Sequence, residues 1–585
     1  MKAVMRYTGA RILVETIIEQ GVDTIFGYPG GTVLNIYDEL YRQKKRIRHI
    51  LATHEQHAAH AAYGYARSTG RTGVCIASSG PGATNLITGI ATAYMDSIPL
   101  VAITGNVPTH LLGKDSFQEV DMAGISMPVV KHNWIVKDVR DLAEIIREAF
   151  TVAAFERPGP VLVDIPKDIT AQITGWSPAK AVSCNRKRGS TAETVLSERA
   201  VRLAQRSEKS GYNEDDIKKA ASLLMEAKRP LLYAGGGVIG ANVCDKLKNL
   251  AERLNAPVAL SLMGIGAMPQ NHRLCTGLIG MHGTVASNKA AQKADLLVAI
   301  GARFSDRVTS RSDMFASSAK VLHFDIDPAE INKNIKTNAW VSGDLRETLA
   351  ALLARLPLKM KTGWDNEIEN WKTHVPQTHA KSSAKKNELH PRLIIEETAK
   401  KLGPHCIAVT DVGQHQIWAA QFFPASGPRT FISPGGLGTM GFGLGAACGV
   451  KIANPFKPVV LFSGDGSFRM NCAEMSTLAG YKIPVLIIIF NNQSLGMIRQ
   501  WQSLFYESRY FEADLHSSPD FVKLADAYGI SGFRAHNCNL FLKALETAGL
   551  ALSEGRSFLI DAIIDKDEKV LPMVPSGASI DKQIL

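Results

Sequence analysis

Short apolar runs alternate with segments of helical periodicity along most of the chain. Apolar runs of about four to eight residues that are bounded by glycine or proline are typical of buried strands. The predicted strands are 24–26, 49–52, 73–77, 99–104, 160–166, 230–234, 257–262, 295–301, 321–327, 407–411, 430–432, 459–463, 485–490 and 557–564. Because helical segments separate these strands, the pattern predicts an α/β fold built of doubly wound parallel sheets.

This alternation is interrupted twice, and the interruptions predict the domain boundaries. Residues 171–213 gather Lys, Arg, Ser and Gly, and 356–389 is a second polar stretch, so both are predicted to be linkers exposed to solvent. The three domains between them would be 1–170, 214–355 and 390–585. Domains usually hold about 100 to 200 residues, which agrees with this division. Their similar patterns predict one layout used three times.

The composition excludes several classes of protein. No apolar run approaches the roughly 20 residues that span a bilayer, and the first residues lack the apolar core of a signal peptide, so we expect a cytoplasmic protein without a membrane anchor. The formal charge is +11, but the basic residues are spread along the chain, so nucleic-acid binding is not expected. The eight cysteines occur singly and predict neither a disulfide framework nor a zinc site.

Candidate chemistry is concentrated at the ends of two predicted strands, 459–463 and 485–490. Asp465 follows the first between two glycines, and Asn492 follows the second. The carboxyl ends of parallel strands meet at one edge of a sheet, where α/β proteins bind ligands. Asp465, Asn492 and a main-chain carbonyl such as that of Ser494 would form an oxygen shell for Mg²⁺. The glycines let amide groups approach a phosphate, so we predict a metal-bridged diphosphate site.

The segment between these two turns is predicted to be a helix. Asn471 and Glu474 resemble a capping pair at its start, and Pro484 would end it before the second strand. The alternative for either polar turn taken alone is an ordinary tight turn without a ligand.

The strand-helix-strand frame with Asp465 and Asn492 resembles the thiamine diphosphate binding motif. The run Asn-Asn-Gln-Ser-Leu-Gly-Met-Ile-Arg-Gln-Trp-Gln that starts at Asn491 resembles the catalytic large subunit of acetohydroxyacid synthase, also called acetolactate synthase. The resemblance extends over nearly the whole chain, from the Gly-Tyr-Pro-Gly-Gly at Gly27 to the tail segment that ends at Ala578. It implies a pyrimidine-binding domain, a central FAD-binding domain and a diphosphate-binding domain in that order.

Glu55 is the candidate for activating the coenzyme, because thiamine diphosphate needs one carboxyl group next to a ring nitrogen. It lies in His-Glu-Gln-His-Ala-Ala-His at the start of an alanine-rich helix. Read locally, it could equally be a surface glutamate that the helix dipole favours. The block from Glu55 to Pro99, with Ser79-Gly-Pro-Gly-Ala-Thr-Asn inside it, resembles the family's pyrimidine-binding domain and puts Glu55 at the catalytic glutamate.

The resemblance also implies the other residues around the coenzyme and the substrate. Those near the coenzyme would be Gly30, Pro81, Asn85, Gln414, His415, Gly438, Met440, Gly466 and Ser467. Gln118 would lie close to the thiazolium ring and Lys167 would line the substrate channel. Phe117, Met497 and Trp501 would contact substrate, with Trp501 favouring 2-oxobutyrate as the acceptor. From the sequence alone, Trp501 could equally be a core aromatic residue.

Four glycine-rich or polar segments of the central domain resemble the FAD-binding segments of this family. They begin at Ala234, Gly280, Gly301 and Phe324. Arg303 would pair with phosphates or carbonyls of the flavin, and Asp325 would meet the adenosine end. The full set that the resemblance implies is Arg157, Gly235, Gly236, Gly237, Ser261, Leu262, Gly280, Met281, His282, Gly301, Arg303, Arg307, Asp325, Ile326 and Asp344.

The activity implied is decarboxylation of pyruvate and transfer of the hydroxyethyl unit to a second pyruvate or to 2-oxobutyrate, in branched-chain amino acid biosynthesis. A homodimer or homotetramer, a small regulatory subunit and a structural FAD would accompany it. The alternatives are another thiamine diphosphate enzyme, such as a pyruvate oxidase or a different carboligase, and a silent paralogue that binds a partner. Five residues depart from the family's usual ones, namely His57, Tyr63, Asn106, Ser305 and Gly445.

Overall fold

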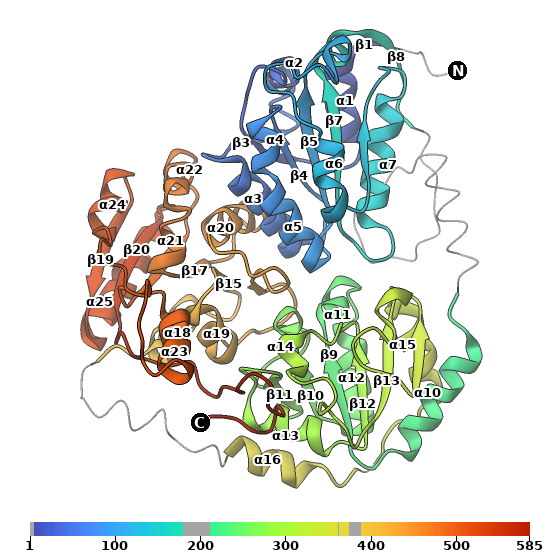
Figure 1. Cartoon of the computed structure of the whole chain (residues 1–585), viewed down its shortest axis with the longest axis vertical. Helices are drawn as coiled ribbons and strands as arrows, with labels where there is room; N and C mark the ends of the chain where they lie inside the picture. Colours follow the sequence, from blue (N-terminus) through green and yellow to red (C-terminus); the bar gives the residue numbers. More distant parts are fainter. Residues whose placement is uncertain (1–4, 180–210, 361, 374–387) are drawn as a thin grey trace. The chain divides into compact units, whose positions relative to one another are not determined.

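The computed structural model describes residues 5–179, 211–360, 362–373 and 388–585 (Figure 1). The chain forms two compact units. The first holds the described residues of 1–209 together with Gly436–Phe456 and Asn471–Val485, and the second holds the remainder. Much of both predicted linkers, 180–210 in the first and 361 and 374–387 in the second, lies outside the described residues.

The first unit is built on a parallel sheet of six strands with the order β3-β2-β4-β5-β7-β6. Its strands are β2 (Thr24–Gly27), β3 (Arg48–Leu51), β4 (Gly73–Ala77), β5 (Leu100–Asn106), β6 (Asn133–Ile135) and β7 (Pro160–Pro166). A separate antiparallel pair joins β1 (Met5–Thr8) to β8 (Ile173–Trp176), so the segment predicted as a linker begins with a strand. Its α-helices are α1 (Gly9–Glu19), α2 (Leu34–Arg42), α3 (Glu55–Thr69), α4 (Pro81–Asn85), α5 (Ile87–Asp96), α6 (Met122–Ser126), α7 (Leu142–Ala154), α8 (Lys167–Ala171), α20 (Gly443–Ala453) and α22 (Met475–Gly480).

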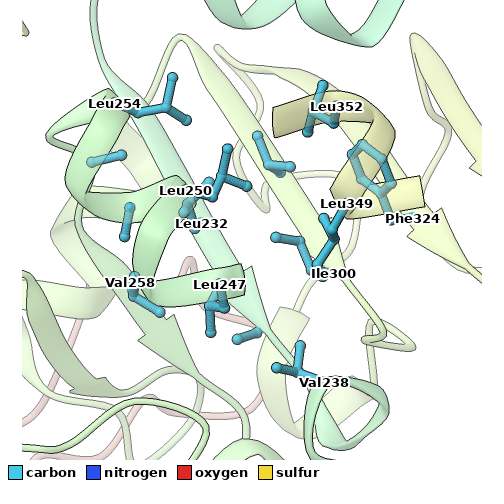
Figure 2. Packing of buried hydrophobic residues seen from close by; sticks show 14 of the residues in the cluster. Leu232, Val238, Leu247, Leu250, Leu254, Val258, Ile300, Phe324, Leu349 and Leu352 are labelled. Atoms are coloured by element: carbon cyan, nitrogen blue, oxygen red, sulfur yellow. The ribbon is translucent and has the colours of Figure 1, made fainter. Parts of the chain in front are cut away.

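The second unit contains two further parallel sheets, and the middle one has the order β11-β10-β9-β12-β13-β14. Its strands are β9 (Pro230–Ala234), β10 (Val258–Leu260), β11 (Cys275–Leu278), β12 (Leu296–Ile300), β13 (Lys320–Asp325) and β14 (Ala339–Ser342). The α-helices are α10 (Glu214–Glu226), α11 (Gly236–Gly240), α12 (Cys244–Leu254), α13 (Val285–Lys293), α14 (Asp306–Thr309), α15 (Leu345–Arg355) and α16 (Asp365–Thr373). Figure 2 shows Leu247 and Leu250 of α12 packing on Leu232, in a fully buried core that extends to Leu349 of α15.

The third sheet has the order β16-β15-β17-β18-β20-β19 and is also parallel. Its strands are β15 (Ile407–Thr410), β16 (Phe431–Ile432), β17 (Val459–Gly464), β18 (Leu486–Asn491), β19 (Ser531–Ala535) and β20 (Phe558–Ile563). The α-helices are α18 (Pro391–Leu402), α19 (Gln414–Phe422), α21 (Asp465–Phe468), α23 (Gly496–Phe505), α24 (Phe521–Ala527) and α25 (Cys538–Ser553). The all-parallel sheets confirm the predicted α/β class.

The three sheets do not share one strand order. In the first and third sheets the strands follow the same sequence of positions, but the middle sheet steps outward from β9 through β10 to β11 and then restarts at β12 on the other side of β9. The predicted α/β layout thus recurs in all three sheets, but the strand order, which was not predicted from the sequence, differs in the middle sheet. An apolar run shows that a strand is buried but not on which side of its predecessor it pairs. The order of the middle sheet is that of dinucleotide-binding folds.

Helices α3 and α20 pack at very short range within the first unit. A side chain at Gly64 would overlap the main chain of Ala446, and one at Gly449 would overlap the main chain of Ala61. Both helices are buried along most of their lengths. Glycine is therefore required at this crossing because the two backbones touch. No helix in the described ranges is both long and apolar enough to cross a membrane.

Candidate active site

Asp465 and Asn492 lie together at the carboxyl edge of the third sheet. Gly464, the last residue of β17, is in register with Phe490 of the neighbouring β18, so the next residues of both strands leave the sheet side by side. The main-chain N–H of Gln493, the neighbour of Asn492, faces the Asp465 carboxyl. The structure thus brings the two predicted metal ligands to one place.

The Asp465 carboxyl is buried and incompletely paired. Its Oδ1 accepts a hydrogen bond from Gly466 N at 3.0 Å, but its Oδ2 has no hydrogen-bond partner among the residues that the structure describes. Burial raises the pKa of Asp465 to about 7, although the N–H groups of Gly466 and Gln493 oppose the rise. An unpaired buried carboxylate oxygen is costly, and a cation beside it removes that cost. The donor set therefore fits a divalent cation.

The neighbouring loops complete this edge of the sheet. Asn492 Oδ1 accepts from Ser494 N at 3.1 Å, and its Nδ2 donates to Gln414 Oε1 at 3.3 Å. His415 packs against Gly464, and burial lowers its pKa to about 3, so its ring is neutral. Its Nε2 is also buried without a hydrogen-bond partner in the described part of the chain. Asp465 Oδ2 and His415 Nε2 are thus two buried polar atoms that lack a hydrogen-bond partner within the described ranges. A polar ligand bound at this edge could supply both partners.

Gln414 is engaged with protein groups. Its Nε2 donates to Gln500 Oε1 at 2.9 Å and to the carbonyl of Glu568 at 2.8 Å. Gln500 is buried and also bonds both main-chain groups of Val570, with Val570 N donating at 2.8 Å and Val570 O accepting at 3.1 Å. The side chain of Gln414 therefore holds Asn492 and the C-terminal segment in place.

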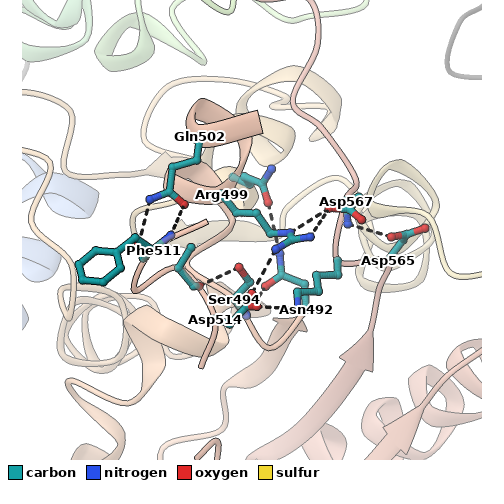
Figure 3. Close-up of polar contacts among 11 residues, drawn as sticks. Asn492, Ser494, Arg499, Gln502, Phe511, Asp514, Asp565 and Asp567 are labelled. Atoms are coloured by element: carbon teal, nitrogen blue, oxygen red, sulfur yellow. Dashed lines mark hydrogen bonds and ion pairs between the residues drawn. The ribbon is translucent and has the colours of Figure 1, made fainter. Parts of the chain in front are cut away.

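Helix α23 carries the predicted substrate residues Met497 and Trp501, and ion pairs fix it (Figure 3). Arg499 bonds Asp567 at 2.8 Å and Asp514 at 3.3 Å, and Ser494 Oγ donates to the carbonyl of Ala513 at 2.8 Å. Trp501 is partly buried and its ring meets that of Phe505 edge to face. It is thus neither a core aromatic residue nor a fully exposed one.

Glu55 is the first residue of α3 in the first unit. Its Oε2 accepts a hydrogen bond from Asn85 Nδ2 at 2.9 Å, and a side chain at Gly82 would crowd its Oε1. Gln118 packs against Gly80. The backbone of Gln118 has a φ of 59°, a conformation that non-glycine residues rarely adopt. Gly30 packs closely on Ser78, the residue that begins the loop with Gly80. Glu55 and Gln118 therefore lie against the turn that leads into α4 and against α4 itself, the helix that begins at Pro81 and ends at Asn85.

The remaining residues of the first unit that were predicted near the coenzyme or the substrate are Lys167, Phe117, Gly438 and Met440. Lys167 follows β7 and is exposed, and Phe117 is 88% exposed. The loop with Gly438 and Met440 is tied to α5, because Asp96 Oδ1 accepts from Gly436 N at 2.6 Å and Thr439 shares a hydrogen bond of 2.7 Å with Thr92. The hydrogen bond described for the Glu55 carboxyl comes from Asn85 and not from Lys167.

The predicted flavin residues of the middle sheet follow the carboxyl ends of its strands. Gly235 and Gly237, after β9, touch the main chain of Gly301, after β12, at the point where the strand order reverses. Ligands of doubly wound folds bind at this crevice. Asp325 is the last residue of β13. The segments after strands of this sheet also hold Gly236, Ser261, Leu262, Gly280, Met281, His282, Arg303, Arg307, Ile326 and Asp344. Arg157 lies in the first unit, where its Nε donates to Ser97 Oγ at 2.9 Å.

Comparison with known proteins agrees with this arrangement. Three family models match the chain in order: the N-terminal TPP binding domain of thiamine pyrophosphate enzymes at 7–125, the central domain at 217–352 and the C-terminal TPP binding domain at 411–562. The acetolactate synthase large subunit of Parasynechococcus marenigrum is 44% identical over 98% of this chain and 90% of its own length. An acetolactate synthase of Mycobacterium bovis is 45% identical over 99% of this chain and 92% of its own length. The acetolactate synthase isozyme 3 large subunit of Escherichia coli is 42% identical over 99% of this chain and 98% of its own length.

The chain belongs to the acetolactate synthase family. It is a thiamine diphosphate-dependent acetolactate synthase, an enzyme of branched-chain amino acid biosynthesis. The predicted family, fold class and activity are confirmed. The comparisons give no support to a pyruvate oxidase, another carboligase or a silent paralogue.

Four of the five residues expected to depart from the family's usual pattern have polar partners in the structure. His57 Nδ1 lies 3.1 Å from Glu474 Oε1, and Tyr63 Oη donates to Asp96 Oδ2 at 2.8 Å. Asn106 donates to Asp164, a buried carboxyl whose pKa burial raises to about 6. Ser305 caps α14 by accepting from Arg307 N at 3.2 Å. The contacts described here therefore accommodate these four residues, His57, Tyr63, Asn106 and Ser305.

Two buried residues of this acetolactate synthase escaped the sequence prediction. Gln500 lies in the run that starts at Asn491, but the sequence predicted roles for its neighbours Met497 and Trp501 and none for Gln500. Glu474 was predicted as half of a capping pair with Asn471, but α22 begins at Met475 and the Glu474 carboxylate bonds instead to Thr53, His57 and Thr477. These partners are distant in sequence, so only the folded chain shows them.

Proposed function

We propose that Asp465, Asn492 and the main-chain carbonyl of Ser494 hold Mg²⁺, and that this ion anchors the diphosphate of thiamine diphosphate. The observation that carries this proposal is the buried, unpartnered Oδ2 of Asp465 beside Asn492 at the switch point of a parallel sheet. Gly466, Ser467 and His415 lie at the same edge and would contact the diphosphate oxygens.

Glu55 would act at the other end of the coenzyme. Thiamine diphosphate, when bound, supplies the carbanion chemistry that breaks the bond between the carboxyl and carbonyl carbons of pyruvate. Glu55 would exchange a proton with the ring nitrogen of the aminopyrimidine, and the 2.9 Å bond from Asn85 would orient its carboxyl. Gln118 and Lys167 would contact the 2-oxo acid, whose carboxylate a lysine suits.

The acceptor would be a second pyruvate or 2-oxobutyrate, with Phe117, Met497 and Trp501 shaping its pocket. We also propose that FAD binds at the crevice of the middle sheet as a structural cofactor. The dinucleotide-type strand order and the contact between Gly235 and Gly301 support this site.

A product assay with omission of each cofactor tests these proposals together. With pyruvate, thiamine diphosphate, Mg²⁺ and FAD, we expect acetolactate, and added 2-oxobutyrate should divert product to 2-aceto-2-hydroxybutyrate. Chelation of the metal should abolish both products. Heat-released flavin should amount to about one per chain, since one sheet of the described residues has this dinucleotide-type strand order. Acetate and peroxide as products, or protein that releases no flavin, would contradict the respective proposal.

We further propose that active sites form between two copies of the chain. The residues expected at the pyrimidine end, such as Glu55, belong to the first unit, and those at the diphosphate end, such as Asp465, belong to the second. Co-expression of Glu55→Gln and Asp465→Ala chains tests the proposal, because a mixed dimer would combine one doubly defective site with one intact site. Random pairing should restore about a quarter of wild-type activity. Activity no higher than that of either variant alone would show that one chain supplies both ends.

The assembly would contain further copies or partners. Relatives named as large subunits suggest that a separate small subunit binds this chain and carries feedback inhibition. We propose a homodimer or homotetramer of the catalytic chain in the cytoplasm, bound to such a subunit.

A further inference from the structure

Glu474 is a buried carboxylate, 2% exposed, that belongs to the first unit although it follows β17 in sequence. Its Oε1 accepts hydrogen bonds from Thr53 N at 2.8 Å, from Thr53 Oγ1 and from His57 Nδ1 at 3.1 Å. Its Oε2 accepts from Thr477 Oγ1 at 2.8 Å. Every Glu474 oxygen is therefore used, and three of the four donors belong to the segment around Glu55.

The charge of Glu474 is well stabilised in this position. Burial by itself raises the pKa of Glu474, but hydrogen bonds and the field of His57, with the Thr53 and Thr477 hydroxyls, outweigh burial and hold the pKa below its ordinary value. Charge-assisted hydrogen bonds of this kind are roughly twice as strong as neutral ones. The contacts therefore fix the backbone of Thr53 firmly.

These contacts straddle Glu55. Thr53 lies two residues before Glu55 and His57 two residues after it, and the intervening His54 caps α3 by accepting from Gln56 N at 3.1 Å. The approach to α3 is held as well, since Leu51 N donates to Tyr481 Oη at 3.0 Å. The Leu51 carbonyl lies 3.2 Å from the Thr477 hydroxyl, whose one proton the shorter bond to Glu474 uses. The first turn of α3 is thus clamped by Glu474 and the residues that follow it.

We infer that Glu474 is a positioning residue that sets the place of the Glu55 carboxyl against the coenzyme. The inference rests on the proposed role of Glu55. Displacement of a reacting group by about 1 Å can cost 10²-fold in rate. Glu474 acts through the main chain and the first helical turn and does not itself exchange a proton with the coenzyme.

Two substitutions separate positioning from direct chemistry. Glu474→Ala removes all four acceptor contacts, and we expect kcat to fall by about 10- to 100-fold. Glu474→Gln keeps an oxygen for Thr53 and His57 and an amide for the Thr477 hydroxyl, so it should retain kcat within about threefold. The rate of deuterium exchange at the thiazolium C2 of bound coenzyme, measured without pyruvate, should follow kcat in both variants. Glutamine that is as damaging as alanine would overturn the inference, since a proton-transfer role requires the carboxyl.

A double variant distinguishes action through Glu55 from a general loss of structure. If Glu474 acts through Glu55, Glu55→Gln combined with Glu474→Ala should be no slower than Glu55→Gln alone. Losses that multiply would overturn the inference. A Glu55→Gln chain that keeps full turnover would instead refute the proposed role of Glu55, so the two failures are distinguishable.

Matched controls guard against misfolding. Glu39→Ala removes another buried carboxylate of the first unit, on α2, whose contacts are with Gln43 and Arg42. It should leave kcat and C2 exchange unchanged even where thermal stability falls. If Glu474→Ala does not fold, Thr53→Val removes one donor only and should lower kcat and C2 exchange by a common, smaller factor. Full C2 exchange in Thr53→Val would then contradict the inference.

Discussion

Replacement of Glu55 by glutamine is expected to lower kcat for acetolactate formation by about 10²- to 10⁴-fold, the usual cost of losing a positioned acid or base. An amide cannot exchange the proton that the coenzyme ring requires, but it can still accept the hydrogen bond from Asn85. The variant should therefore fold and bind thiamine diphosphate with little loss. Steady-state kinetics and coenzyme titration by tryptophan fluorescence measure the two quantities separately.

Glu39→Gln serves as the control for this substitution, because Glu39 is also a helical glutamate of the first unit. The contacts described for its carboxylate are with Arg42, the last residue of α2, and with Gln43, which follows the helix. Its turnover should match that of the wild type. Near-normal turnover in Glu55→Gln with coenzyme bound would remove Glu55 from the mechanism.

Asp465→Asn should weaken the binding of Mg²⁺ and thiamine diphosphate by more than about 100-fold, because even residues that only support metal ligands contribute 10- to 100-fold. Without the ion and the coenzyme, however, the same substitution should not lower the stability of the protein. The folded-state pKa of Asp465 is raised to about 7 from 3.8, so its ionisation costs stability increasingly as pH rises through this interval. At pH 8 the neutral variant should unfold at the same temperature as wild-type apoprotein or higher.

Thermal unfolding with and without Mg²⁺ and coenzyme checks both parts of this prediction. The wild type should gain stability on adding them, and Asp465→Asn should gain almost none. Asp520→Asn makes the same chemical change at a carboxylate that caps α24 in the second unit and should leave the gain intact. An Asp465→Asn protein that still gained wild-type stability would show that the ion binds elsewhere.

The sequence predicted the fold class because buried parallel strands are continuous apolar runs with glycine at their ends. Val459 to Gly464 and Leu486 to Asn491 are such runs, and the loops after them could be placed at one edge by topology alone. Edge strands were harder. β8 pairs only with β1 and is mostly exposed, so it has no apolar run and was included in a predicted linker. The order of the strands within each sheet was not predicted, because an apolar run does not indicate which neighbour a strand pairs with.

Candidate site residues could be proposed from the sequence where a short motif contains the chemistry, as in Gly464-Asp465-Gly466. They were not predictable where the chemistry depends on partners far along the chain. Glu474 and Thr53 are adjacent only because 471–485 folds into the first unit. Local spacing instead favoured a helix cap for Glu474. The clamp around Glu55 is thus a tertiary feature, and no periodicity in the sequence indicates it.

The glycine crossing of α3 and α20 affects how the chain can fold as it leaves the ribosome. Helix α3 is complete once Thr69 has been added, but α20 follows only at Gly443, roughly 370 residues later. At typical elongation rates of about 5 to 20 residues per second, synthesis of the intervening residues takes roughly 20 to 75 seconds. During that time the alanine-rich face of α3 has no partner helix. Nascent chains of this protein therefore carry an exposed apolar groove during most of their synthesis, which makes them clients for chaperones that bind such surfaces.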